Sequence, residues 1–196
     1  AVDFAAGTKD VFCTLPASVA VFGKQEGTNF TDSLLVGHST TGTLSTATEN
    51  TGVGIDAMDA LTTGDKNTCV GHKAGTALTT GGYNVFIGLE AGATMTGSGT
   101  SNVGLGAYAL GAANTGNNNV GIGTSAGQAI TGVHNICIGR DAGYNISSGS
   151  GNVNIGGAAA ASATADRVLT IAGNDGSTTT TWISGDNTGS VEINEA

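Results

Sequence analysis

Apolar and polar residues alternate in a short block that returns about every 17 residues along the middle of the chain. Each block opens with Asn and closes with Gly, as in NVFIG at 84–88 and NICIG at 135–139. The residue before the Gly is always Val, Ile or Leu, and most blocks carry a second apolar residue two positions earlier. A period of two is that of a β-strand and not of a helix. The block therefore predicts one short strand per repeat.

The positions of the blocks define a long ladder of like residues. Successive asparagines are 17, 17, 18, 17, 16 and 17 residues apart. We expect each Asn to lie at a turn, in left-handed geometry, and to hydrogen-bond its counterpart in the adjacent repeat. One period upstream of Gly54 lies Gly37, which predicts an eighth unit with Ser33 in the Asn position. The ladder residues are Asn50, Asn67, Asn84, Asn102, Asn119, Asn135 and Asn152, with Gly54, Gly71, Gly88, Gly106, Gly123, Gly139 and Gly156 closing the blocks.

The remainder of each repeat predicts two turns and a second strand. After the block comes an Ala that is usually followed by Gly, a step that suits a corner with close backbones or positive φ. A further apolar position follows at Leu61, Leu78, Met95, Ala113, Ile130 and Ile146. One such unit cannot bury its own apolar face, whereas stacked units bury one another. The fold class is therefore all-β, a β-roll or β-solenoid of about eight 17-residue repeats over residues 33–160.

The two ends lack the repeat, and we expect a β-rich cap at each. Residues 1–32 form an N-terminal cap or junction, with strands predicted at VFCTL (11–15) and SVAVFG (18–23). Residues 161–196 form a C-terminal cap or connector. Three strands are predicted there within RVLTIAG (167–173), TTTTWISGD (178–186) and SVEIN (190–194). Caps matter because an exposed solenoid edge would recruit strands from other molecules.

Composition adds an argument for assembly and excludes two classes of partner. The chain has 34 glycines and only 5% aromatic residues, so Ala, Gly, Val and Ile in the interior leave a thin private core. We expect several chains to share one core. A net charge of -9 disfavours nucleic acid. No apolar run is long enough for a membrane helix and no signal-peptide pattern is present, so no membrane insertion is expected. Because the chain begins at Ala1, we expect it to be a piece of a longer protein.

The candidate chemical residues favour structural roles. Cys13, Cys69 and Cys137 form no CxxC pair. Cys69 and Cys137 share a repeat position about 19 Å apart at about 4.8 Å per repeat, so they are expected to be free, small, buried side chains. His38 and His72 share a column and His134 lies in another, without the spacing of a metal site. A His38 or His72 site on a trimer axis stays open, but surface histidines are the simpler interpretation. Neither a cofactor nor a metal is expected.

Catalysis is not expected, because the acids do not converge. Asp56, Asp59, Asp65, Glu90 and Asp141 are assigned to different columns as isolated solvated charges. GTSAG at 123–127 superficially resembles a nucleophile elbow but is one instance of the repeat. Two surface features remain open. Tyr83, Tyr108, Tyr144 and Trp182 are candidate glycan contacts, with inter-chain packing as the commoner role of such aromatics. Thr62, Thr79, Thr96 and Thr131 form a partial column that raises an ice-binding alternative.

The units NVFIGLEAG, NVGIGTSAG and NICIGRDAG resemble the Gly-Ala-Asn repeats of bacteriophage tail fibres and tailspikes over about two thirds of the chain. They are more loosely similar to the heads of trimeric autotransporter adhesins, whose coils are shorter. TTTTWISGD followed by SVEIN also looks like the region that precedes an endosialidase-type intramolecular chaperone in such fibres. No chaperone residue is present, so no self-cleavage site transfers. Ala196 is then expected to be the mature terminus or an artificial boundary.

The resemblance implies a homotrimeric, SDS-resistant fibre on the virion. Its expected partners are two further copies of the chain, a host cell-surface glycan or protein receptor, and other virion tail proteins. The expected function is structural and adhesive, for attachment to the host cell. Two alternatives remain, namely the head of a trimeric adhesin on the bacterial surface and an ice-binding β-solenoid.

Overall fold

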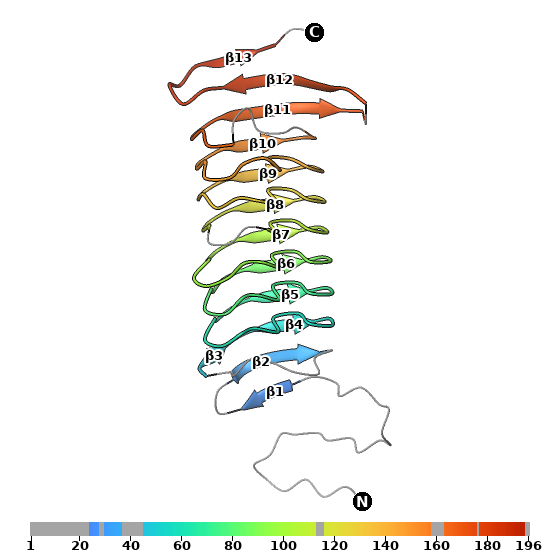
Figure 1. Ribbon diagram of the computed structural model, residues 1–196, viewed down its shortest axis with the longest axis vertical. Coiled ribbons are helices and arrows are strands. Elements are labelled where there is room, and N and C mark those ends of the chain that lie inside the picture. The colour runs from blue at the N-terminus through green and yellow to red at the C-terminus, as the bar shows by residue number, and fades with distance from the viewer. Residues whose placement is uncertain are drawn as a thin grey trace, which may run out of the picture.

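The chain forms one tall stack of strands, with the described N-terminal strands at one end and the C-terminal strands at the other (Figure 1). The computed structural model describes residues 24–27, 30–36, 45–112, 116–157, 163–175 and 177–194. All secondary structure in these ranges is β, in a single sheet. The strands are β1 Lys24–Gly27, β2 Phe30–Val36, β3 Ala47–Thr48, β4 Thr51–Val53, β5 Thr68–Val70, β6 Val85–Ile87, β7 Val103–Leu105, β8 Val120–Ile122, β9 Ile136–Ile138, β10 Val153–Ile155, β11 Leu169–Asn174, β12 Thr179–Gly185 and β13 Val191–Ile193.

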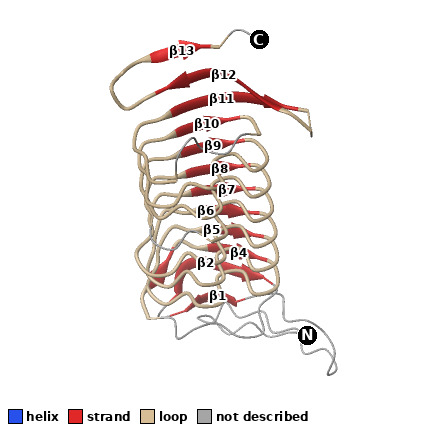
Figure 2. Cartoon of the chain, turned by 45° about the horizontal axis from the view of Figure 1, so that its top comes forward, coloured by secondary structure: helices blue, strands red, loops and turns tan. Residues whose placement is uncertain are grey.

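Each repeat is one rung of a β-solenoid, which confirms the predicted fold class. Strands β4 to β10 pair in parallel and in exact repeat register, so Thr51 lies beside Thr68 and Val53 beside Val70. The rest of each rung loops behind the sheet and returns one level higher (Figure 2). Each backbone thus bonds the rungs above and below it, so adding a rung buries the edge of the one before.

The predicted second strand in each rung is wrong. Leu61, Leu78, Met95, Ile130 and Ile146 are fully buried, but they lie in turns and irregular backbone, and Ala113 lies outside the described residues. The backbone N–H groups of residues 62, 63 and 64 all point at one acceptor, the carbonyl of Thr79, at 3.0 to 3.2 Å. Three donors converging on one oxygen make a tight corner and leave no ladder for a strand.

Left-handed residues turn the chain at three places in each rung, one of which is the second residue after the block Gly, such as Asp56 at φ 58° and Ser125 at φ 56°. At the Ala-Gly corner, Gly75, Gly92, Gly127 and Gly143 have φ between 56° and 60°, as the sequence predicts. The expected left-handed geometry of the ladder asparagines is wrong. The residue before each Asn adopts it instead, for example Tyr83 at φ 61°, because the Asn itself starts the strand and points inward.

Large and small side chains compensate one another in the interior. The middle residue of each strand points inward and shares space with the Ala-Gly corner. Phe86 lies against Gly92, where an added Cβ would sit 2.6 Å from its ring. Where the middle residue is Gly52, the corner carries Met58, fully buried at φ 56°. Leu110, at φ 50°, fills the same corner beside Gly121 and Gly127. Burial of a large side chain here outweighs the strain of left-handed geometry, about 1–2 kcal/mol.

The stack has a hairpin at each described end. β1 pairs with β2 in antiparallel fashion, and β2 then begins the parallel stack with Leu34 beside Thr51. Ser33 occupies the Asn position, because its Oγ accepts the Asn50 N–H at 2.7 Å. The strands predicted at 11–15 and 18–23 lie outside the described residues. At the other end β11 adds one more parallel rung, and β12 and β13 continue in antiparallel fashion, as the three C-terminal segments predict.

Candidate functional site

The interior wall of the solenoid is a ladder of buried asparagine side chains. All seven are at most 1% exposed. The Asn50 Oδ1 accepts both the backbone N–H and the Nδ2 of Asn67, each at 3.0 Å, and Asn67 Nδ2 also donates to the Gly81 carbonyl at 2.9 Å. Contacts of this kind continue to Asn152. A buried amide is stable only when its donors and acceptors are satisfied, and the ladder does this within and between rungs.

The block glycines are fixed by two constraints at once. Gly54, Gly71 and Gly88 have φ between 133° and 138°, a region that side chains rarely adopt. A Cβ at Gly71 would also meet the Gly88 carbonyl oxygen at 2.5 Å. The same holds, at φ between 98° and 127°, for Gly106, Gly123, Gly139 and Gly156. These residues set the rung spacing and carry no chemistry.

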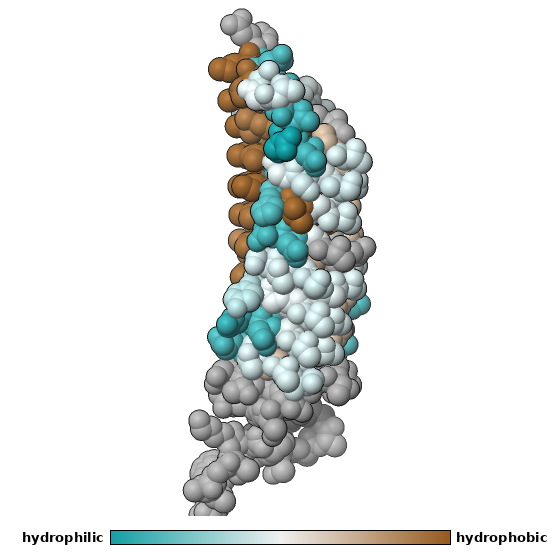
Figure 3. All heavy atoms as spheres, turned by 90° about the vertical axis from the view of Figure 1, so that its left-hand side faces the viewer, coloured by the Kyte–Doolittle hydropathy of each residue, from teal (hydrophilic) through white to brown (hydrophobic). Residues whose placement is uncertain are grey.

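An exposed apolar stripe covers the outer face of the same strands. We expected Val and Ile to fill the interior, and this is wrong for the strand residues, although Ile130 and Ile146 are fully buried. Asn occupies the position before each strand and points inward, so the alternation of a strand turns its middle residue inward and its first and third residues outward. The stripe forms a continuous brown band along the molecule in Figure 3. The outward direction of the Val and Ile side chains could have been predicted from the sequence, because a buried Asn before the strand determines which strand residues face out.

Two columns make up the stripe. The first-position column consists of Thr51, Thr68, Val85, Val103, Val120, Ile136 and Val153. The third-position column consists of Val53, Val70, Ile87, Leu105, Ile122, Ile138 and Ile155. β11 extends both columns by one rung, with Leu169 and Ile171.

The C-terminal hairpin carries the stripe further. Ile171 lies directly opposite Ile183, and Ile183 opposite Ile193. Directly paired residues of antiparallel strands share a face, so Ile193 and Val191 belong to the stripe. They are 78% and 61% exposed. From β4 to β11, seven steps of about 4.8 Å and a width of about 12 Å give roughly 400 Å². Apolar patches of this size on single chains are often functional.

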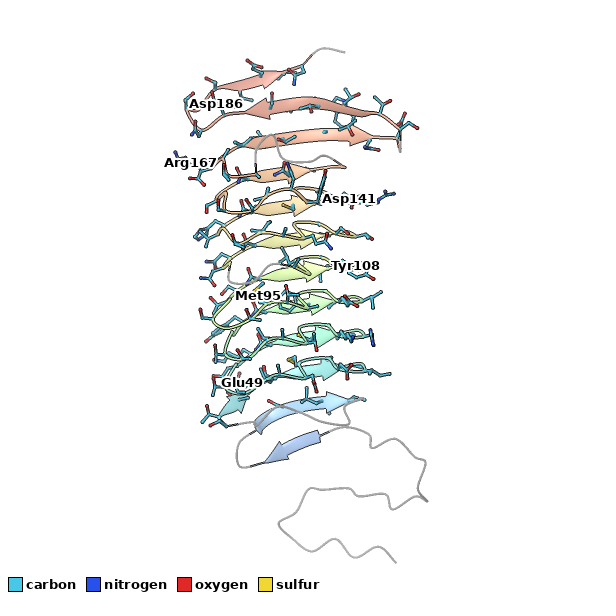
Figure 4. All side chains as sticks on the ribbon, in the orientation of Figure 1. Glu49, Met95, Tyr108, Asp141, Arg167 and Asp186 are labelled. Carbon is cyan, nitrogen blue, oxygen red and sulfur yellow. The ribbon has the colours of Figure 1, made fainter. Side chains whose placement is uncertain are left out.

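Polar columns flank the stripe on both sides. The N-side flank precedes each Asn and consists of Glu49, Lys66, Tyr83, Ser101, Asn118, His134, Gly151 and Arg167. The C-side flank lies two residues after each block Gly and consists of Asp56, Lys73, Glu90, Tyr108, Ser125 and Asp141; the column between it and the block is mixed and includes the exposed Ile55 and Leu89. Figure 4 shows Glu49 and Arg167 on one edge of the stack and Tyr108 and Asp141 on the other. An apolar centre with polar borders is typical of a surface that is covered in an assembly.

One cluster on the N-side flank links three rungs. Lys66 Nζ lies 3.9 Å from a Glu49 carboxylate oxygen, 3.3 Å from the Tyr83 hydroxyl and 5.0 Å from the centre of the Tyr83 ring. The hydrogen bond to Tyr83, followed by the Glu49 charge, raises the pKa of Lys66. The ammonium is solvated, so the cluster contributes little to stability.

The acidic residues are partly aligned but do not converge. Contrary to expectation, Asp56, Glu90 and Asp141 share the C-side flank. Asp56 and Glu90 are nonetheless two rungs apart, about 10 Å, and Asp141 lies three rungs further on. Paired glycosidase carboxylates are about 5–9.5 Å apart. Asp59 lies in another column, and Asp65 has a structural partner, accepting the Thr48 N–H at 2.7 Å.

The remaining polar candidates are dispersed. Ser125 of GTSAG lies in a left-handed corner on the C-side flank and not between a strand and a helix. His72 and His134 are exposed on opposite sides of the strands, with His134 Nε2 3.4 Å from Asn118 Nδ2, and His38 lies outside the described residues. Among described residues, no three of His, Cys, Asp and Glu come close enough to hold a metal ion.

The cysteines are buried inside the stack. Cys69 and Cys137 are middle strand residues, fully buried and free. Burial raises the pKa of the Cys69 thiol, and it raises that of Cys137 to about 12. Both thiols therefore stay protonated and act as small apolar side chains, as expected. Cys13 lies outside the described residues.

The exposed aromatic residues are spread over the surface. Tyr83 and Tyr108 lie on opposite flanks, Tyr144 lies in a third column, and Trp182 is in β12 over Gly173. They are 37% to 59% exposed and do not form one platform.

Three of the four threonines in the column, Thr62, Thr79 and Thr131, bond the backbone through their hydroxyls. Thr62 Oγ1 donates to the Thr79 carbonyl at 3.0 Å, and Thr131 Oγ1 donates to the Ser147 carbonyl at 3.2 Å. These hydroxyls are ladder contacts and do not form a regular array facing water, so nothing specific favours ice binding.

Comparison with protein-family models, curated proteins and solved structures finds no match. Within the described ranges, no helix is long and apolar enough to cross a membrane. The apolar stripe with its two polar flanks is therefore the candidate functional surface, on the strength of this chain's own geometry.

Proposed function

We propose that the chain is a structural and adhesive segment of a virion fibre, a phage tail fibre or tailspike, in which three copies share a core through the apolar stripe. The observation that carries the proposal is the stripe itself. A band of Val, Ile and Leu, with Thr51 and Thr68 at its N-terminal end, lies on the outer face of the strands, whereas the asparagine amides are buried inside. The number three comes from the resemblance of the repeats to trimeric tail fibres.

Self-assembly explains the stripe better than any small ligand. The stripe repeats at the rung spacing and is flat across parallel strands, so another surface fits it over its whole length only if it has the same spacing. A second copy has that spacing by construction. Covering roughly 400 Å² at about 25 cal/mol per Å² gives about 10 kcal/mol per chain before the entropic cost of association. Specific interfaces usually cover about 800 Å² per partner and association costs about 4–15 kcal/mol, so the proposed assembly also requires contacts from the polar flanks and the C-terminal hairpin.

The ladder and the charge suit an extended attachment rod. Backbone and side-chain hydrogen bonds link every rung to the next, which favours a stiff shaft. The acidic surface, with a net charge of -9, keeps such a rod soluble. A cell-surface glycan or protein is the proposed receptor, with Tyr83, Tyr108, Tyr144 and Trp182 as glycan contacts, and other virion tail proteins are the proposed neighbours along the fibre.

The assembly is tested by mass. Light scattering should give three chains in solution, and an unboiled SDS gel should retain a band that boiling abolishes. The double variant Ile122→Lys/Ile138→Lys buries two charges in the proposed core and should reduce the mass to one chain. Thr96→Lys places one lysine on an exposed corner outside the stripe and should leave the mass unchanged. A single-chain mass for the unaltered protein would refute the shared core.

Adhesion is tested on cells. Fluorescently labelled protein is applied to a panel of bacterial strains, with the Lys double variant as the matched single-chain control. Binding of the assembled protein to some strains, lost after periodate treatment, would indicate a glycan receptor, and loss after protease treatment would indicate a protein. If the assembled protein binds no strain, the adhesive half of the proposal fails and a shaft role remains.

The same stripe fits a trimeric adhesin head on a bacterial surface, which is the second candidate. The two differ in what surrounds the chain in its full-length gene. A C-terminal membrane anchor would favour the adhesin, and neighbouring virion genes would favour the fibre.

A further inference from the structure

The last strand of the sheet leaves one side of its backbone unpaired. β13 ends the strand order, and β12 is its one neighbour among the described strands. The Asn194 N–H donates to the Trp182 carbonyl of β12 at 2.8 Å. Because backbone groups of successive strand residues point to opposite sides, Val191 and Ile193 direct their N–H and C=O groups away from β12. This free edge is as long as the three-residue strands β4 to β10, which pair on both sides.

The two end strands of the sheet differ in how they resist further pairing. β1 has a register irregularity between Gln25 and Gly27, and its sequence includes Lys24. Irregular pairing and lysine are two features by which edge strands avoid recruiting other strands. β13 pairs with β12 in unbroken register and carries the largely exposed Val191 and Ile193. A regular, apolar edge of this kind is a template for another strand.

The charge at this end of the chain selects the kind of strand. After Arg167 the sequence has four acidic residues and no Lys, Arg or His. Glu192 is the middle residue of β13 and is exposed. A strand that pairs with β13 places one residue directly opposite Glu192, where opposite charge stabilises the pair and like charge destabilises it. The other three acids are Asp175, Asp186 and Glu195.

A second copy of the chain is a poor occupant of this edge. Two β13 strands could pair antiparallel, with Val191 of one copy opposite Ile193 of the other. That pairing places the two Glu192 carboxylates directly opposite each other, which is unfavourable. The other acids of the two ends add to the repulsion. The edge therefore suits a strand of opposite charge better than it suits its own copy.

We infer that the β13 edge binds an extended strand of a different protein chain, with Lys or Arg opposite Glu192 and apolar residues opposite Val191 and Ile193. The strand pairs antiparallel, which continues the alternation of β11, β12 and β13. Its basic residue neutralises Glu192, and its apolar residues extend the face on which Ile183 lies opposite Ile193. The site is at the end of the stack and not along the stripe, so it does not depend on the number of copies.

The test supplies such a strand at high local concentration. The sequence TVKVT is appended after Ala196 through a linker of about ten Gly and Ser residues, so that it can fold back onto β13 at an effective concentration of about 1 mM. Amide hydrogen exchange, measured by NMR, should become at least about tenfold slower at Val191 and Ile193. The Asn194 amide, which already bonds the Trp182 carbonyl, should change little.

Matched strands separate the contribution of the backbone from that of the charge. TPKPT keeps the basic residue but lacks the two N–H donors that face the edge, so it should give no protection. TVEVT keeps the donors but places a like charge opposite Glu192, so protection should be about threefold weaker than with TVKVT. Glu192→Lys in the chain should reverse the order of TVKVT and TVEVT.

Each outcome supports or overturns the inference. Protection that decreases from TVKVT to TVEVT and is absent with TPKPT supports it. If no appended strand slows exchange, β13 does not bind strands, and equal protection by TVKVT and TVEVT overturns the basic partner. Slow exchange at Val191 and Ile193 in the unaltered chain also overturns it, because the edge is then covered already. Light scattering tests the shared core separately, and a single-chain mass would refute that core without changing the result at β13.

Discussion

The inner and outer faces of the same strands follow opposite rules. Inward, the middle residues of β4 to β10 are Gly, Cys, Phe, Gly, Gly, Cys and Asn, with no common size. Outward, Thr, Val, Ile and Leu repeat with little change. The core is irregular because neighbouring rungs compensate, as Met58 does for Gly52. A surface that meets another molecule across all rungs has no such neighbour to adjust it. Regularity on the outside is therefore the stronger sign of a partner.

The largest expected effect comes from separating the two faces within one strand. Phe86→Ala should lower the free energy of unfolding by about 3–5 kcal/mol, because it empties a site that Gly75, Gly92 and Gly104 cannot refill. Ile87→Ala, the matched outer variant, should lower the free energy of unfolding by less. Its loss should increase with protein concentration, because the proposed assembly covers Ile87 and forms more completely at high concentration. Urea unfolding at several concentrations measures both. If both variants lose the same free energy of unfolding at every protein concentration, the inner and outer faces do not play different roles.

Breaking the amide ladder should come next. Asn84→Ala removes the acceptor of the Asn102 N–H and Nδ2 and the donor to the Gly99 carbonyl. Unsatisfied buried groups cost about 1–3 kcal/mol each, so a loss of roughly 3 kcal/mol is expected. Thr96→Ala, an exposed position, should change stability by less than about 0.5 kcal/mol. If Asn84→Ala lowers the free energy of unfolding no more than Thr96→Ala does, water satisfies the groups that the amide leaves.

Met58 should reverse the usual order of substitutions. Both Met58→Ala and Met58→Gly empty the interior, but only Gly relieves φ 56°. The Ala variant should therefore unfold more easily, by about 1 kcal/mol. On the outer face Val103 is extended, and there Gly should be the worse replacement. Thermal unfolding of the Ala and Gly variants at Met58 and at Val103 gives the order of stability at each position. If Ala is the more stable replacement at both positions, Met58 is not strained.

Asn154 offers a stabilising change of about 1 kcal/mol. It is 1% exposed and points inward, but neither Nδ2 nor Oδ1 has a hydrogen-bond partner. Asn154→Leu has a similar shape and no unmet polar group, so it should raise the unfolding free energy. Asn154→Ala, which leaves a void, is the control and should not. Destabilisation by Leu would show that the amide is bonded in solution, for example by a buried water.

The smallest effect is local and depends on pH. Asp186 Oδ1 accepts the Thr188 hydroxyl at 2.7 Å, the Thr188 N–H and the Ser190 N–H, which together hold the pKa of Asp186 below its ordinary value, the Thr188 hydroxyl most strongly. Because the pKa of Asp186 is lower in the folded protein, its carboxylate stabilises the turn at pH values above the ordinary pKa. This stabilisation is lost as the pH falls through the pKa of the folded state. Amide shifts of Thr188 and Ser190 should therefore move below about pH 4, while β4 to β10 stay unchanged. Asp186→Asn should abolish this transition.

The period of the sequence was enough to predict the solenoid, the single block strand and the Ser33 rung. Which face points outward was missed, because Val and Ile were assigned to the core by hydrophobicity alone, although the parity of the buried Asn decides it. The positive φ of the residue before each Asn could not be predicted from the sequence, because Glu49, Lys66, Tyr83 and His134 have no chemical property in common. The extra rung at β11 was hidden because Val168 replaces the Asn.

The amide ladder also has a direction. Each Asn Oδ1 accepts from the rung that follows it in the chain, from Asn50 to the last acceptor, Asn152, which receives the Val168 N–H at 2.9 Å. Each rung thus presents an amide oxygen to the rung that follows it in the chain, so the two ends of the ladder differ chemically. Val168 donates its backbone N–H to Asn152 but has no side-chain amide, so the ladder ends there.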